Sequence, residues 1–190
     1  MANYVLFISE NKIKDSSALG GNIDSAFILP YLKIAQKKYI ETKLGTDLFV
    51  KLQSDITAGS LSGVYQTLVD DYIQDALVHW GFFECLPFLR LRVSNNGIGV
   101  KTSETTESIS LEETNSLREE VRNTAEFYTN RLVDFISHNT SDYPEYNTNS
   151  GSDVDPDRDS FYSGMNLEGV GKTRPGEITL DDFLTPDLKP

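Results

Sequence analysis

Apolar residues recur at helical spacing along most of the first 138 residues, and this periodicity restricts the fold more than any other feature of the chain. In three segments, a stripe of apolar side chains would occupy one face of a helix while charged side chains occupy the other. These segments cover about residues 24–44, 61–86 and 110–138, and a shorter helix is predicted over 47–56. The chain is therefore predicted to be mainly α, as a small bundle of about four helices around one core.

Capping residues indicate where the first helix begins and ends. Asp24 is a suitable N-cap, because its carboxylate can accept hydrogen bonds from the first free N–H groups. Pro30 lacks an N–H and would bend the first turns, so regular helix is expected to start nearer Leu29. Gly45 stands where a left-handed C-terminal residue is expected.

The remaining helix ends are predicted from similar signals. Gly59 or Ser60 is expected to end the short helix, and Pro87 is expected to end the helix that begins near Leu61. Ser110 and Glu113 fit a capping box at the start of the last helix, in which each residue satisfies a backbone N–H of the other.

A β-hairpin is predicted at about residues 88–103, between the last two long helices. Leu89, Leu91 and Val93 alternate with arginines, and the Asn-Asn-Gly sequence that follows is typical of a tight turn. A two-stranded hairpin leaves its outer edges open unless another chain covers them. The hairpin is therefore expected to contact a partner.

Residues 139–190 are predicted to form an extended acidic arm, separate from a helical body at 1–138. From residue 138 onward the chain carries 11 acidic and 4 basic residues and is rich in Pro, Gly, Ser and Asn. Such a composition does not bury enough apolar surface to offset the entropy lost on ordering. Spaced apolar side chains nevertheless run from Tyr143 to Leu184, so we expect the arm to dock on another surface.

Composition also limits the compartment and the partners. With Cys85 as its one cysteine, the chain cannot form an internal disulfide, which favours a reducing compartment. No segment is apolar for long enough to span a bilayer, and the first residues lack signal-peptide features, so we expect a soluble protein made in a cytoplasm. The net charge of −12 disfavours sequence-specific binding to nucleic acid, yet it suits a protein that lies near DNA without adhering to it.

Two loop motifs suggest ligand sites but lack essential residues. The sequence GVGKT at 169–173 misses the earlier glycine of a phosphate-binding loop, since Asn166 stands there. The run DVDPDRDSF, with aspartates at alternate positions from Asp153 to Asp159, misses the glycine and the glutamate of a calcium loop. Whether this acidic run binds a cation stays open.

The reactive side chains do not form a catalytic group either. Cys85 lies in an apolar sequence and is expected in the core, where burial raises a thiol pKa. His79 is expected to be a packed side chain, and His138 a helix C-terminal residue. Asp70, Asp71 and Asp75 are expected on an exposed helix face, although a metal-dependent hydrolase built on Asp70–Asp75 is a weaker alternative. We therefore predict no enzyme, no cofactor and no metal site.

The order of these segments also resembles a known family. The sequence DSAFILPYLKIAQKKYIETKLGTDLFVKL at 24–52 is followed by VYQTLVDDYIQDALVHWGFFECLP, by RVSNNGIGVKTSETTES, and by a helix that ends near SDYPEY. Over about residues 5–146 this pattern resembles the head–tail connector proteins of tailed bacteriophages, above all those of crAss-like phages. The family carries no catalytic residues, so none is transferred to this chain.

The resemblance implies a structural virion protein that acts by assembly. Such adaptors form a ring, usually of about twelve copies, below the portal, where they extend the DNA channel and hold neck or tail proteins. The expected partners are therefore further copies of the chain, the portal and neck or tail proteins, with DNA passing through unread. The alternative is a monomeric acidic module that engages a basic partner through its C-terminal arm. Residues expected at the interfaces come from the hairpin and the arm: Arg90, Arg92, Asn96, Ile98, Lys101, Tyr143, Tyr146, Phe161, Tyr162, Phe183 and Leu184.

Overall fold

The computed structural model of the protein describes residues 4–19, 23–94, 97–100, 110–148, 150 and 153–158, with the backbone alone for 90–94 and 97–100. This part of the chain is mainly helical, as predicted. Its α-helices are α1 Glu10–Ser16, α2 Ser25–Ala35, α3 Glu41–Ala58, α4 Gly63–Leu68, α5 Gln74–Arg90 and α6 Leu111–His138. The π-helical turns are η1 Gln36–Ile40 and η2 Val69–Ile73, the 3₁₀ turn is η3 Pro144–Tyr146, and the strands are β1 Leu91–Ser94 and β2 Gly97–Val100.

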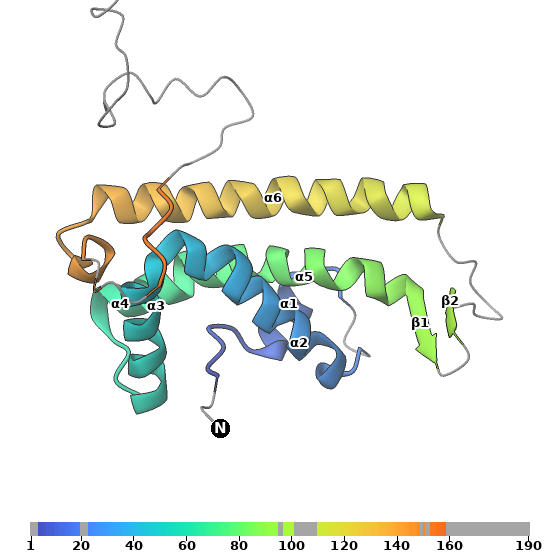
Figure 1. Ribbon diagram of the computed structural model, residues 1–190, viewed down its shortest axis with the longest axis horizontal. Helices are drawn as coiled ribbons and strands as arrows, with labels where there is room; N and C mark the ends of the chain where they lie inside the picture. The colour runs from blue at the N-terminus through green and yellow to red at the C-terminus, as the bar shows by residue number, and fades with distance from the viewer. Residues whose placement is uncertain are drawn as a thin grey trace, which may run out of the picture. The chain divides into compact units, whose positions relative to one another are not determined.

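Helix α5 is the centre of the bundle. The antiparallel helix α6 lies along one side of it, and α2 with α1 packs against another (Figure 1). A helix covered on several sides needs apolar residues around most of its circumference, and α5 has them. Its buried side chains are Ala76, Leu77, Val78, Trp80, Phe82, Phe83, Cys85 and Leu86.

Trp80 connects three elements of this core. Its ring stacks on Tyr39 of η1 with centroids 3.6 Å apart, and its indole N–H donates to the hydroxyl of Thr129 on α6 over 2.8 Å. The stack contributes aromatic contact, and the hydrogen bond satisfies a buried polar atom in an otherwise apolar interface. Trp80 thereby fixes how α6 and η1 face α5.

The helix ends confirm some predictions and correct others. Asp24 caps α2, and Ser110 with Glu113 forms the predicted capping box. Pro30, however, lies inside α2, which begins at Ser25. The proline is tolerated there because both Pro30 and Ala26, whose carbonyl loses its intrahelical donor, are exposed to water.

Pro87 does not end its helix either, because α5 continues to Arg90. The ring of Phe88 stacks on Tyr31 of α2 with centroids 4.9 Å apart, so tertiary packing holds the last turn of α5 helical. As a result, strand β1 begins at Leu91, later than expected from the alternation that starts at Leu89. Residues of β1 and β2 pair in antiparallel register, with Leu91 opposite Val100 and Ser94 opposite Gly97.

The sequence did not predict how the N-terminal segment is held. Gln36 of η1 is fully buried, and its side chain accepts a hydrogen bond from the N–H of Phe7 over 2.8 Å and donates one to the carbonyl of Val5 over 2.8 Å. The side-chain amide of Gln36 thus bonds one backbone N–H and one backbone carbonyl of the N-terminal segment, as a neighbouring strand would do in a sheet. Phe7 then packs edge-on against Phe49 of α3 at 5.1 Å.

Gln36→Leu should lower the free energy of unfolding by about 1–3 kcal/mol, because it leaves the buried N–H of Phe7 without a partner, whereas the carbonyl of Val5 keeps its bond from Gln53. Urea denaturation measures this difference. Gln53→Leu is the matched control, since Gln53 also donates to the carbonyl of Val5, over 3.1 Å, but leaves that carbonyl its bond from Gln36. We expect the control to cost less than about 1 kcal/mol. Equal costs for the two variants would contradict this role of Gln36.

Candidate interaction surfaces

The structure places two of the predicted interface residues inside the protein. Tyr143 and Tyr146 are each only 1% exposed, so neither is available to anchor a partner. The hydroxyl of Tyr143 donates to the carbonyl of Val64 over 3.0 Å, and its ring contacts Tyr65 and Phe135. These aromatic rings were assigned to the arm because their local sequence is polar, but tertiary contacts add them to the core.

The predicted boundary at residue 138 is therefore too early. The compact unit that contains the helices spans Met1–Ser160. Beyond α6 the chain turns through η3, and residues 153–158 then pack against α3. We call residues 153–158 the strap. Of the other predicted interface residues, Arg90 ends α5, Arg92 lies in β1 and Ile98 in β2, with only their backbone described. The rest lie outside the described residues: Asn96, Lys101, Phe161, Tyr162, Phe183 and Leu184.

The strap lies against a break in α3. At Gly45 the backbone leaves the helical region, with φ 75° and ψ 161°, although helix continues on both sides. In an unbroken helix the N–H of Thr46 would donate to the carbonyl of Thr42, four residues earlier. We call this interruption, at residues 42–47, the notch.

Strap and notch complete each other's backbone hydrogen bonds. The N–H of Thr46 donates to the carbonyl of Val154 over 3.0 Å, and the carbonyl of Thr42 accepts from the N–H of Asp157 over 2.9 Å. The strap thus lies between the N–H of Thr46 and the carbonyl of Thr42, which would bond to each other in an unbroken helix. This arrangement satisfies backbone groups that the break would otherwise leave to water.

Side chains add to this contact. The ammonium of Lys43 lies 2.8 Å from the carboxylate of Asp157, and the hydroxyl of Thr46 accepts from the N–H of Val154 over 3.0 Å. Just before the strap, the carboxylate of Asp47 accepts hydrogen bonds from the hydroxyl and the N–H of Ser150, and these bonds lower the pKa of Asp47. An acid at the start of a helical segment is also favoured by the helix dipole.

A glycine is required at position 45 for two independent reasons. Its φ and ψ lie in a region that is essentially restricted to glycine. In addition, a Cβ at this position would lie 2.6 Å from Cγ of Pro156, closer than carbon atoms approach. Gly45 and Pro156 therefore form a matched pair, although the sequence predicted only an ordinary C-terminal glycine at residue 45.

Gly45→Ala should destabilise the protein by about 2–4 kcal/mol, because backbone strain and overpacking each cost about 1–3 kcal/mol. Gly59→Ala is the matched control: Gly59 also has positive φ, but a Cβ added there would meet nothing within 4 Å. We expect it to cost about 1–2 kcal/mol. Chemical denaturation measures both, and adding Pro156→Ala should recover part of the Gly45→Ala loss. Strict additivity of the two substitutions would show that the side chains at 45 and 156 do not meet.

Burial also makes the region around α4 and η3 sensitive to alkaline pH. Desolvation raises the pKa of Tyr143 to about 12. Desolvation likewise raises the pKa of Tyr65, whose hydroxyl donates to the carboxylate of Glu145 over 2.7 Å. Both phenols therefore stay protonated in the folded protein at pH values where the unfolded chain ionises them.

The free energy of unfolding should consequently fall as pH rises from about 10, the ordinary tyrosine pKa, to about 12. The unfolded chain releases protons in this interval that the folded chain keeps. Tyr143→Phe should lose about 1 kcal/mol at pH 7, from the bond to Val64, and should show a shallower decline above pH 10. Thermal melts by circular dichroism at pH 8–12 measure both effects. If stability fell equally steeply above pH 10 in the variant and the parent protein, Tyr143 would not contribute to the pH dependence.

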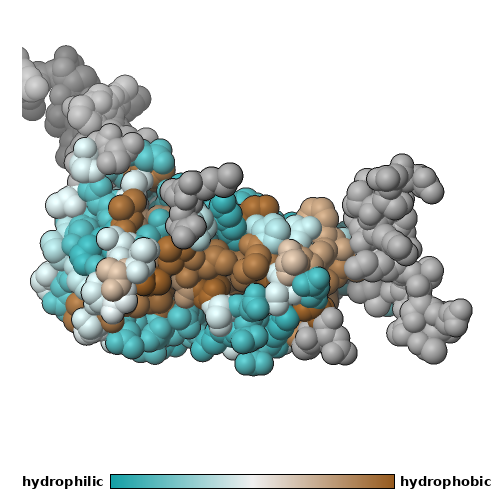
Figure 2. Space-filling view, turned by 90° about the horizontal axis from the view of Figure 1, so that it is seen from below, coloured by the Kyte–Doolittle hydropathy of each residue, from teal (hydrophilic) through white to brown (hydrophobic). Residues whose placement is uncertain are grey.

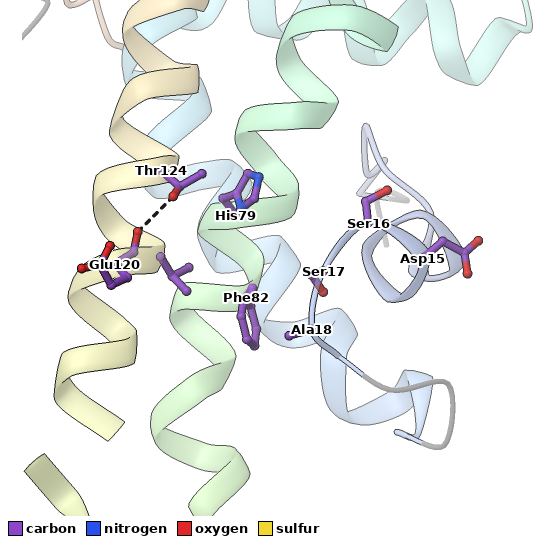
Figure 3. Close-up of a pocket in the computed structure, with 9 residues that line it drawn as sticks. Asp15, Ser16, Ser17, Ala18, His79, Phe82, Glu120 and Thr124 are labelled. Carbon is purple, nitrogen blue, oxygen red and sulfur yellow. Dashed lines mark hydrogen bonds between the residues drawn. The ribbon is translucent and has the colours of Figure 1, made fainter. Parts of the chain in front are cut away.

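A groove beside α5 contains the one described histidine that is half-buried. It has a volume of about 430 Å³ and is lined by Asp15, Ser16, Ser17, Ala18, His79, Phe82, Glu120, Val121 and Thr124. Burial lowers the pKa of His79, which stacks on Tyr128 at 5.1 Å. Asp15 and Glu120 direct their carboxylates away from the imidazole, so the groove does not assemble an acid–base pair (Figure 3).

The remaining reactive groups occupy structural positions. Cys85 is fully buried, as predicted, and burial raises its pKa to about 12. Asp70 accepts hydrogen bonds from Gln66 and Gln74 along its own helix. Among the described residues, no group of three or more His, Cys, Asp or Glu side chains could hold a metal ion. Asp157 of the acidic run pairs with Lys43, while Asp159 lies outside the described residues.

Several large apolar side chains are exposed. Figure 2 shows a band of hydrophobic side chains across the middle of one face, bordered by hydrophilic ones. The most exposed in the described part are Leu111 at 61%, Phe127 at 60% and Val50 at 54%. Leu111, Leu117 and Phe88 lie close in sequence to the two strands, at the start of α6 and the end of α5.

Within the part of the chain that is described, no helix is long and apolar enough to cross a membrane. A family described as a family of unknown function, DUF6712, matches residues 40–156. The match covers more than half of the chain and includes both Gly45 and Pro156, and the protein belongs to this family. No curated protein and no solved structure matches the chain.

Proposed function

We propose that this member of DUF6712 is a structural protein of tailed phage particles, a head-to-tail adaptor that assembles into a ring below the portal. The resemblance of residues 5–146 to phage connector proteins suggests this role. The observation that carries it furthest is the pair of strands β1 and β2, whose outer edges meet no third strand among the described residues.

In a two-stranded antiparallel sheet, each strand is hydrogen-bonded only to the other strand. Backbone N–H and C=O groups therefore remain unpaired along the outer edge of each strand. Such an edge pairs readily with an extended segment of another chain, by β-augmentation. Strand β1 follows α5 without an intervening residue, so the strand pair is attached to the helical body at the end of α5. The predicted hairpin at 88–103 is therefore retained as part of the proposal, as the element that contacts the next subunit.

Apolar exposure on the two helices that flank the strands in sequence supports the same contact. Leu111 and Leu117 of α6 and Phe88 of α5 are 61%, 41% and 41% exposed. Burying such side chains is favourable by about 25 cal/mol per Å² of apolar surface, so a neighbouring subunit that covered them would gain stability. Heterologous contacts of this type close into a ring when the rotation between subunits permits it.

The charge of the chain suits a DNA channel. A net charge of −12 per copy would repel the phosphate backbone, so that DNA could pass through the ring without being held. The expected partners remain further copies, about twelve to a ring, together with the portal and neck or tail proteins. Residues expected at these contacts are Arg90, Arg92, Asn96, Ile98, Lys101, Phe161, Tyr162, Phe183 and Leu184.

Electron microscopy of the purified protein, alone and with portal rings, should show closed rings for the full-length chain, and cross-linking of purified phage particles should locate it at the head–tail junction. A chain that ends at Ser160 is the matched variant, because it keeps the whole compact unit and removes only residues 161–190. It should melt within about 2 °C of the parent, because the compact unit is kept intact, yet bind portal rings more weakly.

Absence of the protein from finished particles would contradict the proposal. A full-length chain that stays monomeric beside portal rings and binds a basic protein one-to-one through residues 161–190 would instead support the alternative, a monomeric acidic module. Truncation at residue 141 would be uninformative, since it removes Tyr143 and Tyr146 from the core.

A further inference from the structure

We propose that the notch at residues 42–47 is a docking site for the strap of a neighbouring copy, so that assembled subunits exchange residues 153–158. The occupant is a second copy of this chain, and the recognised ligand is an extended acidic segment with a proline. This inference rests on the proposed ring, because the ring holds the neighbours side by side.

The notch is held open by the core and not by the strap. Leu44 lies just before the break, and Leu48 and Leu52 follow it; all three are fully buried. Phe49 is also buried and packs against Phe7. Straightening α3 to restore the bond between Thr46 and Thr42 would pull these side chains out of the core, and each large apolar residue lost from a core is strongly destabilising. The N–H of Thr46 and the carbonyl of Thr42 therefore stay accessible to a strap, whether that strap comes from the same chain or from a second copy.

The strap, in contrast, is held by few contacts. Five of its six residues are exposed, and only Pro156 is half-buried. Its ties to α3 include the backbone bonds at Thr42 and Thr46, the ion pair with Lys43 and the packing of Pro156 over Gly45. Exposed hydrogen bonds and ion pairs each contribute little net stability, because water can replace the partner when the segment is released. Release of the strap is therefore inexpensive compared with unfolding of the body.

Every contact of the strap can be reproduced between two copies. Arg158 at the end of the strap donates to the carbonyl of Tyr146 over 3.0 Å and lies over the ring of that residue at 4.9 Å, and Tyr146 belongs to the body. A second copy offers the same Tyr146, the same notch and the same Lys43. Exchange of an identical element between protomers costs little for this reason.

The connection before the strap is short. Six residues, 147–152, join Tyr146 to the strap, and the bonds of Thr148 and Ser150 to Asp47 lie on the exposed surface, where water can replace them. Within one chain, this short connection gives the strap a high effective concentration near its own notch, which favours docking there. Exchange in the proposed ring requires the notch of the neighbouring subunit to lie within reach of this connection, so that the strap of each subunit can occupy the next one.

The ion pair supplies a direct test. A water-soluble carbodiimide joins an amine to a carboxylate without adding a spacer, and the ammonium of Lys43 lies 2.8 Å from the carboxylate of Asp157. Full-length protein of natural isotopic composition is unfolded together with an equal amount of ¹⁵N-labelled protein, refolded, assembled, cross-linked and digested. Mass spectrometry then reports whether the two joined peptides come from one isotopic form or from both.

If straps are exchanged, about half of the joined pairs should contain one peptide of each isotopic form, because neighbours in a ring are drawn at random. Lys43→Arg is the matched control: it keeps the charge but offers no amine, so the joined peptides should disappear. Pairs of uniform isotopic composition only would overturn the exchange, whether or not rings have formed.

Light scattering on the same samples separates this inference from the proposed function. Rings with uniform pairs would overturn the exchange and leave the adaptor role in place. Mixed pairs from particles of only two copies would support the exchange while counting against the ring. Uniform pairs from a monomer would overturn the exchange and count against the ring as well.

Discussion

The interruption of α3 at Gly45 is the constraint on which the arrangement of the described chain depends. Helix before the break continues from η1, whose Gln36 holds the N-terminal segment, and helix after it places Leu48, Phe49 and Leu52 in the core. A break of this kind leaves an unpaired N–H at Thr46 and an unpaired carbonyl at Thr42. Residues 153–158 satisfy both groups, so the end of the compact unit is joined to its beginning.

This closure changes how the C-terminal part of the chain relates to function. The aromatic side chains at 143 and 146 stabilise the compact unit and are not available to a partner. The assembly proposed above therefore depends on other parts of the chain. The strap shares features of a core segment and of an assembly surface. It completes the body chemically, but it is bound by backbone groups and one ion pair that a second copy could supply equally well.

Local sequence predicted the helices well because their signals are local. The capping box of Ser110 and Glu113 and the N-cap Asp24 act within one helical turn, and the structure confirms both. The prolines at 30 and 87 misled the same reasoning, since solvent at Ala26 and the stacking of Phe88 on Tyr31 compensate for the lost hydrogen bonds. Helix α1 and the hydrogen bonds of Gln36 to residues 5 and 7 were not predicted, because a short polar helix and an amide side chain carry no periodic pattern.

The helical class, the apolar faces and the burial of Cys85 follow from the amino-acid sequence, because each depends on the residues of a single helix. Long-range packing alone makes Tyr143 and Tyr146 core residues, places Pro156 against Gly45 and brings Lys43 to Asp157. The last pair is 114 residues apart in sequence. The local sequence around neither segment indicates such a contact. Gly45 is typical of a helix end, and the acidic, proline-containing segment at 153–158 is typical of a linker. Their complementarity exists only once the core has set the angle of α3 and brought the two segments together.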